Sequence, residues 1–152
     1  MPCHSAIEKK TVTAKADDTV EVVLKSIKKA KAQACAVVDD DGMFLGLFSM
    51  KILLKNLIPL SVAMTNGVKI DIKVTAAPGV AKRLANVKTL AVSELMDKNA
   101  DTVFPDAPIW EGVGVLTKEG SPLPVVDNSG KLHGLITYDS LVNDLESIQT
   151  SS

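Results

Sequence analysis

Residues 37–54 read VVDDDGMFLGLFSMKILL and residues 125–142 read VVDNSGKLHGLITYDSLV, so one pattern occurs twice at an offset of 88 residues. The two copies share seven of eighteen positions, which are Val37, Val38, Asp39, Gly42, Gly46, Leu47, Leu53 and their counterparts. Upstream, an offset of 89 pairs Thr13 with Thr102, Asp17 with Asp106 and Val20 with Ile109. Such self-similarity indicates a supersecondary unit that is present twice.

Each copy has the pattern of two short strands joined by a polar turn and flanked by helices. In the first copy, apolar runs at 34–38 and 44–48 predict strands on either side of an acidic turn, which lacks the alternating oxygen ligands of a calcium loop. Asp18, with Glu21 three residues later, predicts the start of one helix, and Ser49 predicts the start of another. The second copy predicts an extended piece at 102–104, strands at 123–126 and 132–136, and helices from Asp106 and Thr137.

The segment between the copies is too long for a plain loop. Alternating apolar residues at 68–74 favour a strand, although their spacing also permits a short helix, and residues 80–87 predict a helix. We therefore expect the first repeat at 1–57, a structured linker at 58–91 and the second repeat at 92–152.

Composition excludes several classes of function. The chain of 152 residues has 17 basic and 18 acidic side chains and a net charge of −1, so it offers no basic field for nucleic acid or an anionic membrane. Hydrophobic residues make up 46%, yet no stretch approaches the roughly 18 apolar residues of a spanning helix. Residues 1–10 lack the apolar core of a secretory signal, so we expect a cytoplasmic protein. With two cysteines, neither a disulfide framework nor a metal clamp is expected, and Cys35 is predicted to be a small buried hydrophobe.

Three stretches carry a resemblance to a known family. They are SPLPVVDNSGKLHGLIT at 121–137, VSELMD at 92–97 and ACAVVDDDGMFLGLFS at 34–49. The chain resembles a tandem pair of cystathionine β-synthase (CBS) domains, a Bateman module. The resemblance implies an α/β (α+β) fold in which two β-α-β-β-α repeats pack by pseudo-twofold symmetry, and a homodimer. It also implies a non-enzymatic regulatory module that requires no cofactor, binds an adenine nucleotide (AMP, ADP or ATP) between the repeats and signals to an effector enzyme or transporter.

Ser49 and Thr137 stand where a strand gives way to a helix, so their hydroxyls and the first free backbone N–H groups suit an oxyanion. The alternative is that both residues are simple helix caps. By resemblance, the ligand contacts of repeat two are Thr102, Val103, Leu123, Pro124, His133, Thr137, Asp139 and Ser140. Those of repeat one are Thr13, Ala14, Cys35, Ser49 and Lys51.

The sequence also departs from the family pattern. Nucleotide-binding members often have an acidic residue three positions after the Ser or Thr, where this chain has Ile52 and Ser140. Asp139 lies one residue earlier in repeat two, and in repeat one Lys51 can meet a phosphate although the sugar clamp is absent. Two hypotheses follow: a sensor that binds an adenylate through repeat two, or a ligand-independent scaffold for dimerisation or docking.

An enzymatic reading has little support. His4 and His133 have no partner at the spacing of a metal site or a nucleophile and base, and no glycine-rich phosphate loop is present. Trp110 stays open between a core residue and an exposed anchor for a partner.

Overall fold

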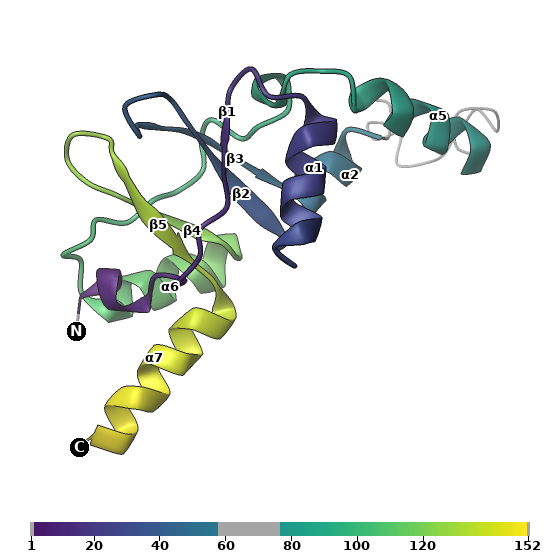
Figure 1. Ribbon diagram of the computed structural model, residues 1–152. Helices are drawn as coiled ribbons and strands as arrows, with labels where there is room; N and C mark the ends of the chain where they lie inside the picture. Colours follow the sequence, from purple (N-terminus) through teal and green to yellow (C-terminus); the bar gives the residue numbers. More distant parts are fainter. Residues whose placement is uncertain (1, 58–76, 152) are drawn as a thin grey trace.

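The computed structural model describes residues 2–57 and 77–151, and Figure 1 shows the arrangement of its elements. The first part contains η1 (Cys3–Ala6), β1 (Thr13–Lys15), α1 (Val20–Lys29), β2 (Ala34–Val38), β3 (Phe44–Ser49) and α2 (Met50–Lys55). The second part contains α5 (Ala77–Val87), η2 (Val92–Glu94), α6 (Ile109–Glu119), β4 (Leu123–Val126), β5 (Leu132–Ile136) and α7 (Tyr138–Ser151). The predicted strand at 68–74 lies outside the described residues.

The strands form two sheets, one in each repeat. In the first sheet, β1 pairs parallel with β2, and β2 pairs antiparallel with β3. In the second sheet, β4 and β5 are antiparallel, and Val103 adds a parallel bridge to Val125 that matches the pairing of Ala14 with Val37. Both sheets have a register shift after the same repeat position, Val37 in one and Val125 in the other. The predicted α+β repeat unit is confirmed.

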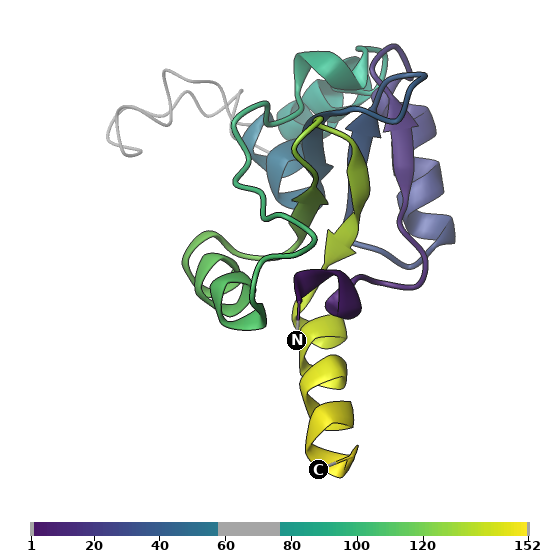
Figure 2. The same cartoon turned by 90° about the vertical axis from the view of Figure 1, so that its left-hand side faces the viewer.

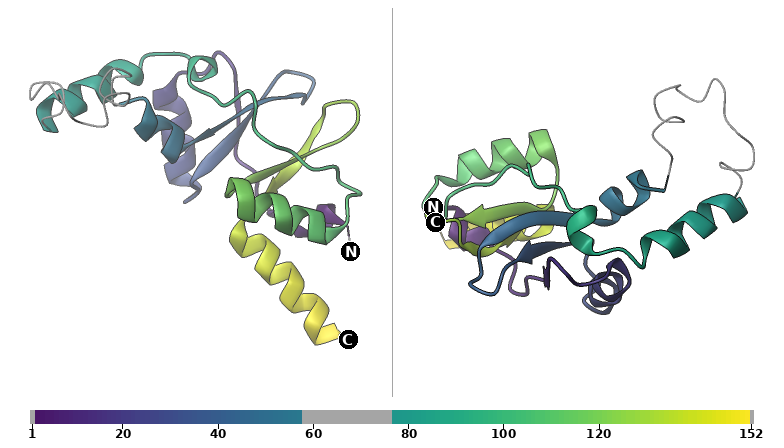
Figure 3. Two further views of the ribbon diagram at one scale, coloured as in Figure 1. Left: turned by 180° about the vertical axis from the view of Figure 1, so that it is seen from behind. Right: turned by 90° about the horizontal axis from the view of Figure 1, so that it is seen from above.

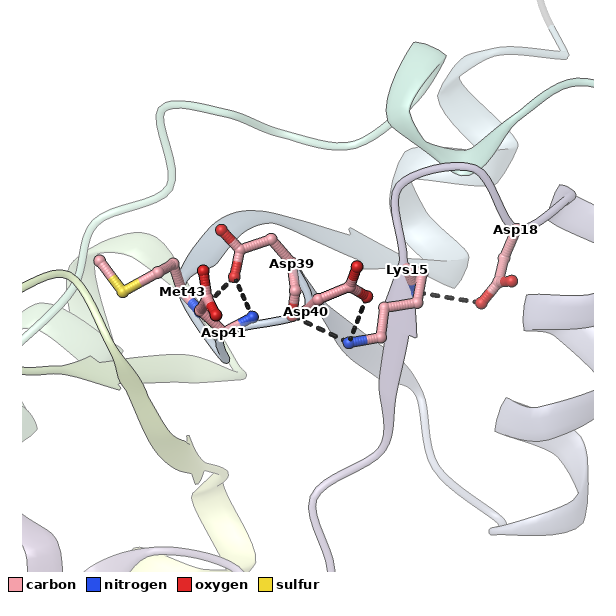
Figure 4. Close-up of polar contacts among 6 residues, drawn as sticks. All are labelled: Lys15, Asp18, Asp39, Asp40, Asp41 and Met43. Atoms are coloured by element: carbon pink, nitrogen blue, oxygen red, sulfur yellow. Dashed lines mark hydrogen bonds and ion pairs between the residues drawn. The ribbon is translucent and has the colours of Figure 1, made fainter.

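Matching aspartates close the two hairpin turns. Asp39 Oδ1 accepts hydrogen bonds from the backbone N–H groups of Asp41 and Met43, both at 2.9 Å. Asp127 Oδ1 accepts from the N–H groups of Ser129 at 2.9 Å and Lys131 at 3.1 Å. In the first turn, Lys15 reaches across from β1, and its Nζ donates to the Asp39 carbonyl at 2.8 Å (Figure 4). The acidic triplet is therefore a turn, as predicted, in which the Asp39 carboxylate accepts hydrogen bonds from the turn's own backbone.

The two hairpins join through a reciprocal pair of hydrogen bonds. The N–H of Phe44 donates to the Gly130 carbonyl at 2.9 Å, and the N–H of Leu132 donates to the Gly42 carbonyl at 3.0 Å. Exchanging the two repeats converts each of these hydrogen bonds into the other, as a pseudo-twofold axis requires. In Figures 1 and 3 the two hairpins lie side by side.

The segment that leads into each repeat packs on the opposite repeat. In η1, Cys3 N donates to the Ala107 carbonyl at 2.8 Å, and in η2, Val92 N donates to the Asp18 carbonyl at 2.8 Å. Two glycines make room for these leading segments, because a Cβ on Gly46 would lie 2.9 Å from Met96 Sδ and a Cβ on Gly134 would overlap Ile7. The exchange of leading segments is the second mark of the pseudo-symmetry.

The exchange places the hydrophobic cores across the expected repeat boundaries. Repeat one buries one face of α1 and all of β2, and this core also takes in Val87, Val92 and Leu95 from beyond residue 57. The core of repeat two contains Cys3 and Ala6 from the first residues of the chain. The division at 57/58 and 91/92 stays a prediction.

Helix α1 begins one residue later than predicted. Thr19 is the N-cap, and its Oγ1 accepts from Val22 N at 3.3 Å. The prediction of Asp18 was wrong because its carboxylate instead accepts from the backbone N–H of Lys15 at 2.9 Å.

Two helices extend away from the sheets, α5 at one end and α7 at the other (Figures 1 and 2). None of the helices in the described part of the chain has the length and apolar character needed to cross a membrane.

Candidate functional site

A cleft of about 570 Å³ is lined by both repeats. Repeat one contributes the loop after α1 and the start of α2, and repeat two contributes the end of β5 and the start of α7. The chain that leads into β1 crosses between them and adds Glu8, Lys10 and Val12. The two predicted strand-to-helix positions, Ser49 and Thr137, both line this cleft.

Thr137 is the more heavily bonded of the two. Its Oγ1 accepts from Ser140 N at 3.1 Å, and its own N–H donates to Ser140 Oγ at 2.8 Å, so the two residues cap the start of α7 reciprocally. The hydroxyl proton of Thr137 goes to Glu8 Oε1. Ser140 is thus occupied with the cap.

Ser49 is the N-cap of α2, and its Oγ accepts from Ile52 N at 3.1 Å. Within the described residues its hydroxyl has no acceptor for its own proton. Ile52 packs against the core of repeat one, which explains why an apolar residue stands at that position. Both hydroxyl positions are therefore helix caps, as the simpler interpretation held, and both also face the cleft.

A sequence model of the CBS domain matches residues 5–59 and 92–147. The chain belongs to the CBS domain family. Two matched segments and the pseudo-twofold arrangement of their hairpins make it a tandem CBS pair.

Solved structures of CBS pairs have the same fold. The CBS-pair protein CBSX2 from Arabidopsis thaliana superposes with a TM-score of 0.76 at 19% identity, over 99% of this chain and 98% of that chain. CBSX2 in complex with AMP gives a TM-score of 0.71 at 19% identity, over 97% and 98% of the two chains. The CBS domain pair of protein MJ0100, in complex with 5′-methylthioadenosine and S-adenosyl-L-methionine, gives 0.65 at 19% identity, over 94% and 98%. No curated protein sequence matches the chain.

The cleft of this CBS pair brings together four of the predicted site residues: Ser49, Lys51, Thr137 and Asp139. Thr13 and Thr102 are exposed elsewhere on the surface. The side chains of another five residues are buried: Ala14, Cys35, Val103, Leu123 and Pro124. Cys35 is a buried hydrophobe as predicted, and burial, followed by the charge of Asp18, raises the pKa of its thiol to about 12. The assignment of all these residues to ligand contacts stays a prediction.

His133 lies in a second hollow, of about 600 Å³, on the side of repeat two. Its Nε2 is 2.8 Å from Asp127 Oδ2, and His4 and Phe104 also line the hollow. No group of three His, Cys, Asp or Glu side chains within the described ranges is placed to hold a metal ion. Trp110, which the sequence left open, is 72% exposed.

Sequence reasoning missed Glu8, Lys10 and Lys31 of the cleft. A signal for Glu8 was present, because an offset of 89 aligns CHSAIEK at 3–9 with VSELMDK at 92–98 and pairs Glu8 with Asp97. Lys31 had no such signal. It follows α1 in the left-handed conformation, with φ 56°, at a position where glycine is usual.

Proposed function

We propose that this CBS pair is a regulatory module that binds an adenine nucleotide or a related adenosine compound in the cleft between its repeats and signals to a partner protein. The observation that carries the proposal is the cleft itself, which places two equivalent helix starts, at Ser49 and Thr137, around one space. The adenosine ligands named for CBSX2 and protein MJ0100 support the same ligand class.

The regulatory step would be a shift between orientations of the repeats. A ligand that contacts both repeats favours the orientation in which both sets of contacts are made, and a partner that reads this orientation responds. The proposal assigns no reaction to the chain. We further propose that the partner is an effector enzyme or transporter and that the module acts as a homodimer.

Thermal denaturation with AMP, ADP, ATP, adenosine and S-adenosylmethionine tests the proposal. A ligand that binds only the folded state stabilises it by about 2.7 kcal/mol at a concentration 100 times Kd. We expect a rise in melting temperature with at least one of these compounds, and calorimetric titration then gives its Kd. If none of them raises the melting temperature at millimolar concentration, the ligand-binding proposal fails.

The second candidate is a scaffold that binds no ligand. Two observations favour it: Ile52 occupies the usual position of the sugar-binding acid, and the Thr137 hydroxyl is already bonded to Glu8. A scaffold predicts that Ser49→Ala and Thr137→Val change only the stability of the fold. The sensor predicts that at least one of them also weakens ligand binding, beyond what its effect on stability explains.

A further inference from the structure

We propose that Glu8 determines which end of the cleft a phosphate group can occupy, and so how a nucleotide lies between the repeats. Glu8 bars the phosphate from the end at Thr137, and the phosphate instead faces the end that Lys31 and Lys51 line. The inference rests on the proposed function, because it concerns the ligand of the same cleft.

Both hydrogen-bond donors of Thr137 are already in use. A hydroxyl group has a single proton to donate, and Thr137 donates it to Glu8 Oε1. The backbone N–H of Thr137 is also occupied, since it donates to Ser140 Oγ at 2.8 Å. A phosphate at this end therefore finds no donor on Thr137 unless Glu8 moves away.

The negative charge beside the start of α7 also disfavours a phosphate. The start of a helix attracts an anion, and at α7 the chain supplies its own carboxylate there. Glu8 is held by its backbone, whose N–H donates to the Leu135 carbonyl at 2.8 Å. Asp139 adds a second carboxylate to the same end of the cleft. Two negative charges repel a phosphate but do not repel an uncharged or cationic group.

Asp97 is the counterpart of Glu8 at the offset of 89 residues. Asp97 has the equivalent backbone position, because its N–H donates to the Leu47 carbonyl at 2.8 Å. Its shorter carboxylate turns to its own loop and accepts from Asn99 N at 2.9 Å. The contact of Glu8 with the helix cap is thus a property of this residue, since the same fold does not produce it at Asp97.

Repeat one contributes two lysines, Lys31 and Lys51, to the lining of the cleft. Lys31 has a φ of 56°, in the left-handed region that is unfavourable for residues with a side chain. It lies at the end of α1, where the N–H of Ala32 donates to the Ile27 carbonyl at 3.0 Å. Neither Lys31 nor Lys51 forms an ion pair with any described residue. Two ammonium groups that no described carboxylate pairs thus line the repeat-one end, where they can neutralise a phosphate.

The experiment compares AMP with adenosine, which differ only in the phosphate, by calorimetric titration of the full chain. Glu8→Gln keeps the shape of the side chain and removes its charge. We expect it to lower the Kd of AMP about tenfold, because the charge that bars the phosphate from the Thr137 end is gone, and to leave that of adenosine within about twofold. Lys31→Gly should raise the Kd of AMP while also raising the melting temperature, because glycine relieves the left-handed conformation.

The matched control is Glu146→Gln, which removes the same charge from an exposed position on α7. It should leave both Kd values unchanged. If the ratio of the AMP Kd to the adenosine Kd does not change in Glu8→Gln or in Lys31→Gly, the inference is overturned. The inference is also overturned if Glu146→Gln changes this ratio as much as Glu8→Gln does. If neither probe binds wild type or variants, the inference fails; the proposed function fails as well only if ADP, ATP and S-adenosylmethionine also leave the melting temperature unchanged.

Discussion

The Asp127 carboxylate forms several hydrogen bonds within its own hairpin. The pKa of its carboxyl lies well below the ordinary 3.8 because it accepts hydrogen bonds from the Ser129 hydroxyl, from the His133 ring and from the backbone of Lys131 and Ser129. A lowered pKa means that folding favours the ionised form. The stabilisation is present in full above the unfolded pKa and is lost as the pH falls through the folded value.

We therefore expect Asp127→Asn to lower the free energy of unfolding at neutral pH, with a difference from wild type that shrinks below a pH of about 4. Urea unfolding at a series of pH values measures it. Ser129→Ala removes the largest cause of the shift, so NMR titration of the Asp127 carboxyl should give a higher pKa in that variant. A difference between wild type and Asp127→Asn that stays constant down to strongly acidic pH would contradict this account.

A second prediction at this scale concerns two glycines with opposite surroundings. Gly134→Ala places a methyl group against Ile7 and should destabilise the protein by about 1–3 kcal/mol. At Gly114 in α6, the space around a new Cβ is open, so Gly114→Ala should stabilise the protein by about 0.5–1 kcal/mol. Chemical denaturation of both variants checks the pair, and equal effects of the same sign would refute the proposed close contact.

Short elements with clear boundaries were predictable from the sequence. The strands at Ala34–Val38, Leu123–Val126 and Leu132–Ile136 are confirmed at their predicted bounds, because polar turn residues flank each apolar run. The leading segments were not predictable, because Cys3 contacts Pro108 and Ala107, more than a hundred residues away in sequence. Local pattern carries no information about such a pairing.

The same limit applies to the cleft. Ser49 and Thr137 were found because a strand-to-helix junction is a local pattern. Glu8 reaches Thr137 across 129 residues, and Lys31 depends on a backbone angle that its sequence does not indicate. Sequence reasoning thus found Lys51 and Asp139 among the charged residues of the cleft but missed Glu8, Lys10 and Lys31.

The exchanged element η1 gives a prediction of its own. Ala6 is 1% exposed in the core of repeat two, so Ala6→Asp buries a charge there and should destabilise the protein by about 2–4 kcal/mol. Ala81→Asp makes the same change at an exposed position of α5 and should have an effect below about 1 kcal/mol. Denaturant unfolding compares the two variants. If Ala6→Asp lowers the free energy of unfolding no more than Ala81→Asp does, η1 contributes little to the core.

For the whole molecule, one face of α7 is apolar and exposed. Tyr138 and Val142 are each 52% exposed, and Leu145 follows at the spacing of one helix face. If the module is a homodimer that uses this face, sedimentation should give twice the chain mass of 16.1 kDa. Val142→Asp should shift the equilibrium toward the monomer, whereas Asn143→Asp, which introduces the same charge at an exposed position beside this face, should not. A monomeric wild-type protein at high micromolar concentration would contradict the dimer.

The crossed leading segments also bear on how the chain can be divided. A cut after residue 57 would leave the first fragment without Val92 and Leu95 and the second without Cys3 and Ala6, so each fragment would expose a hydrophobic slot that only the other can fill. Two such fragments, mixed together, should fold as one heterodimer and poorly alone. The sequence thus repeats in halves, whereas the shared cores lead us to expect that the protein folds as one interlocked unit.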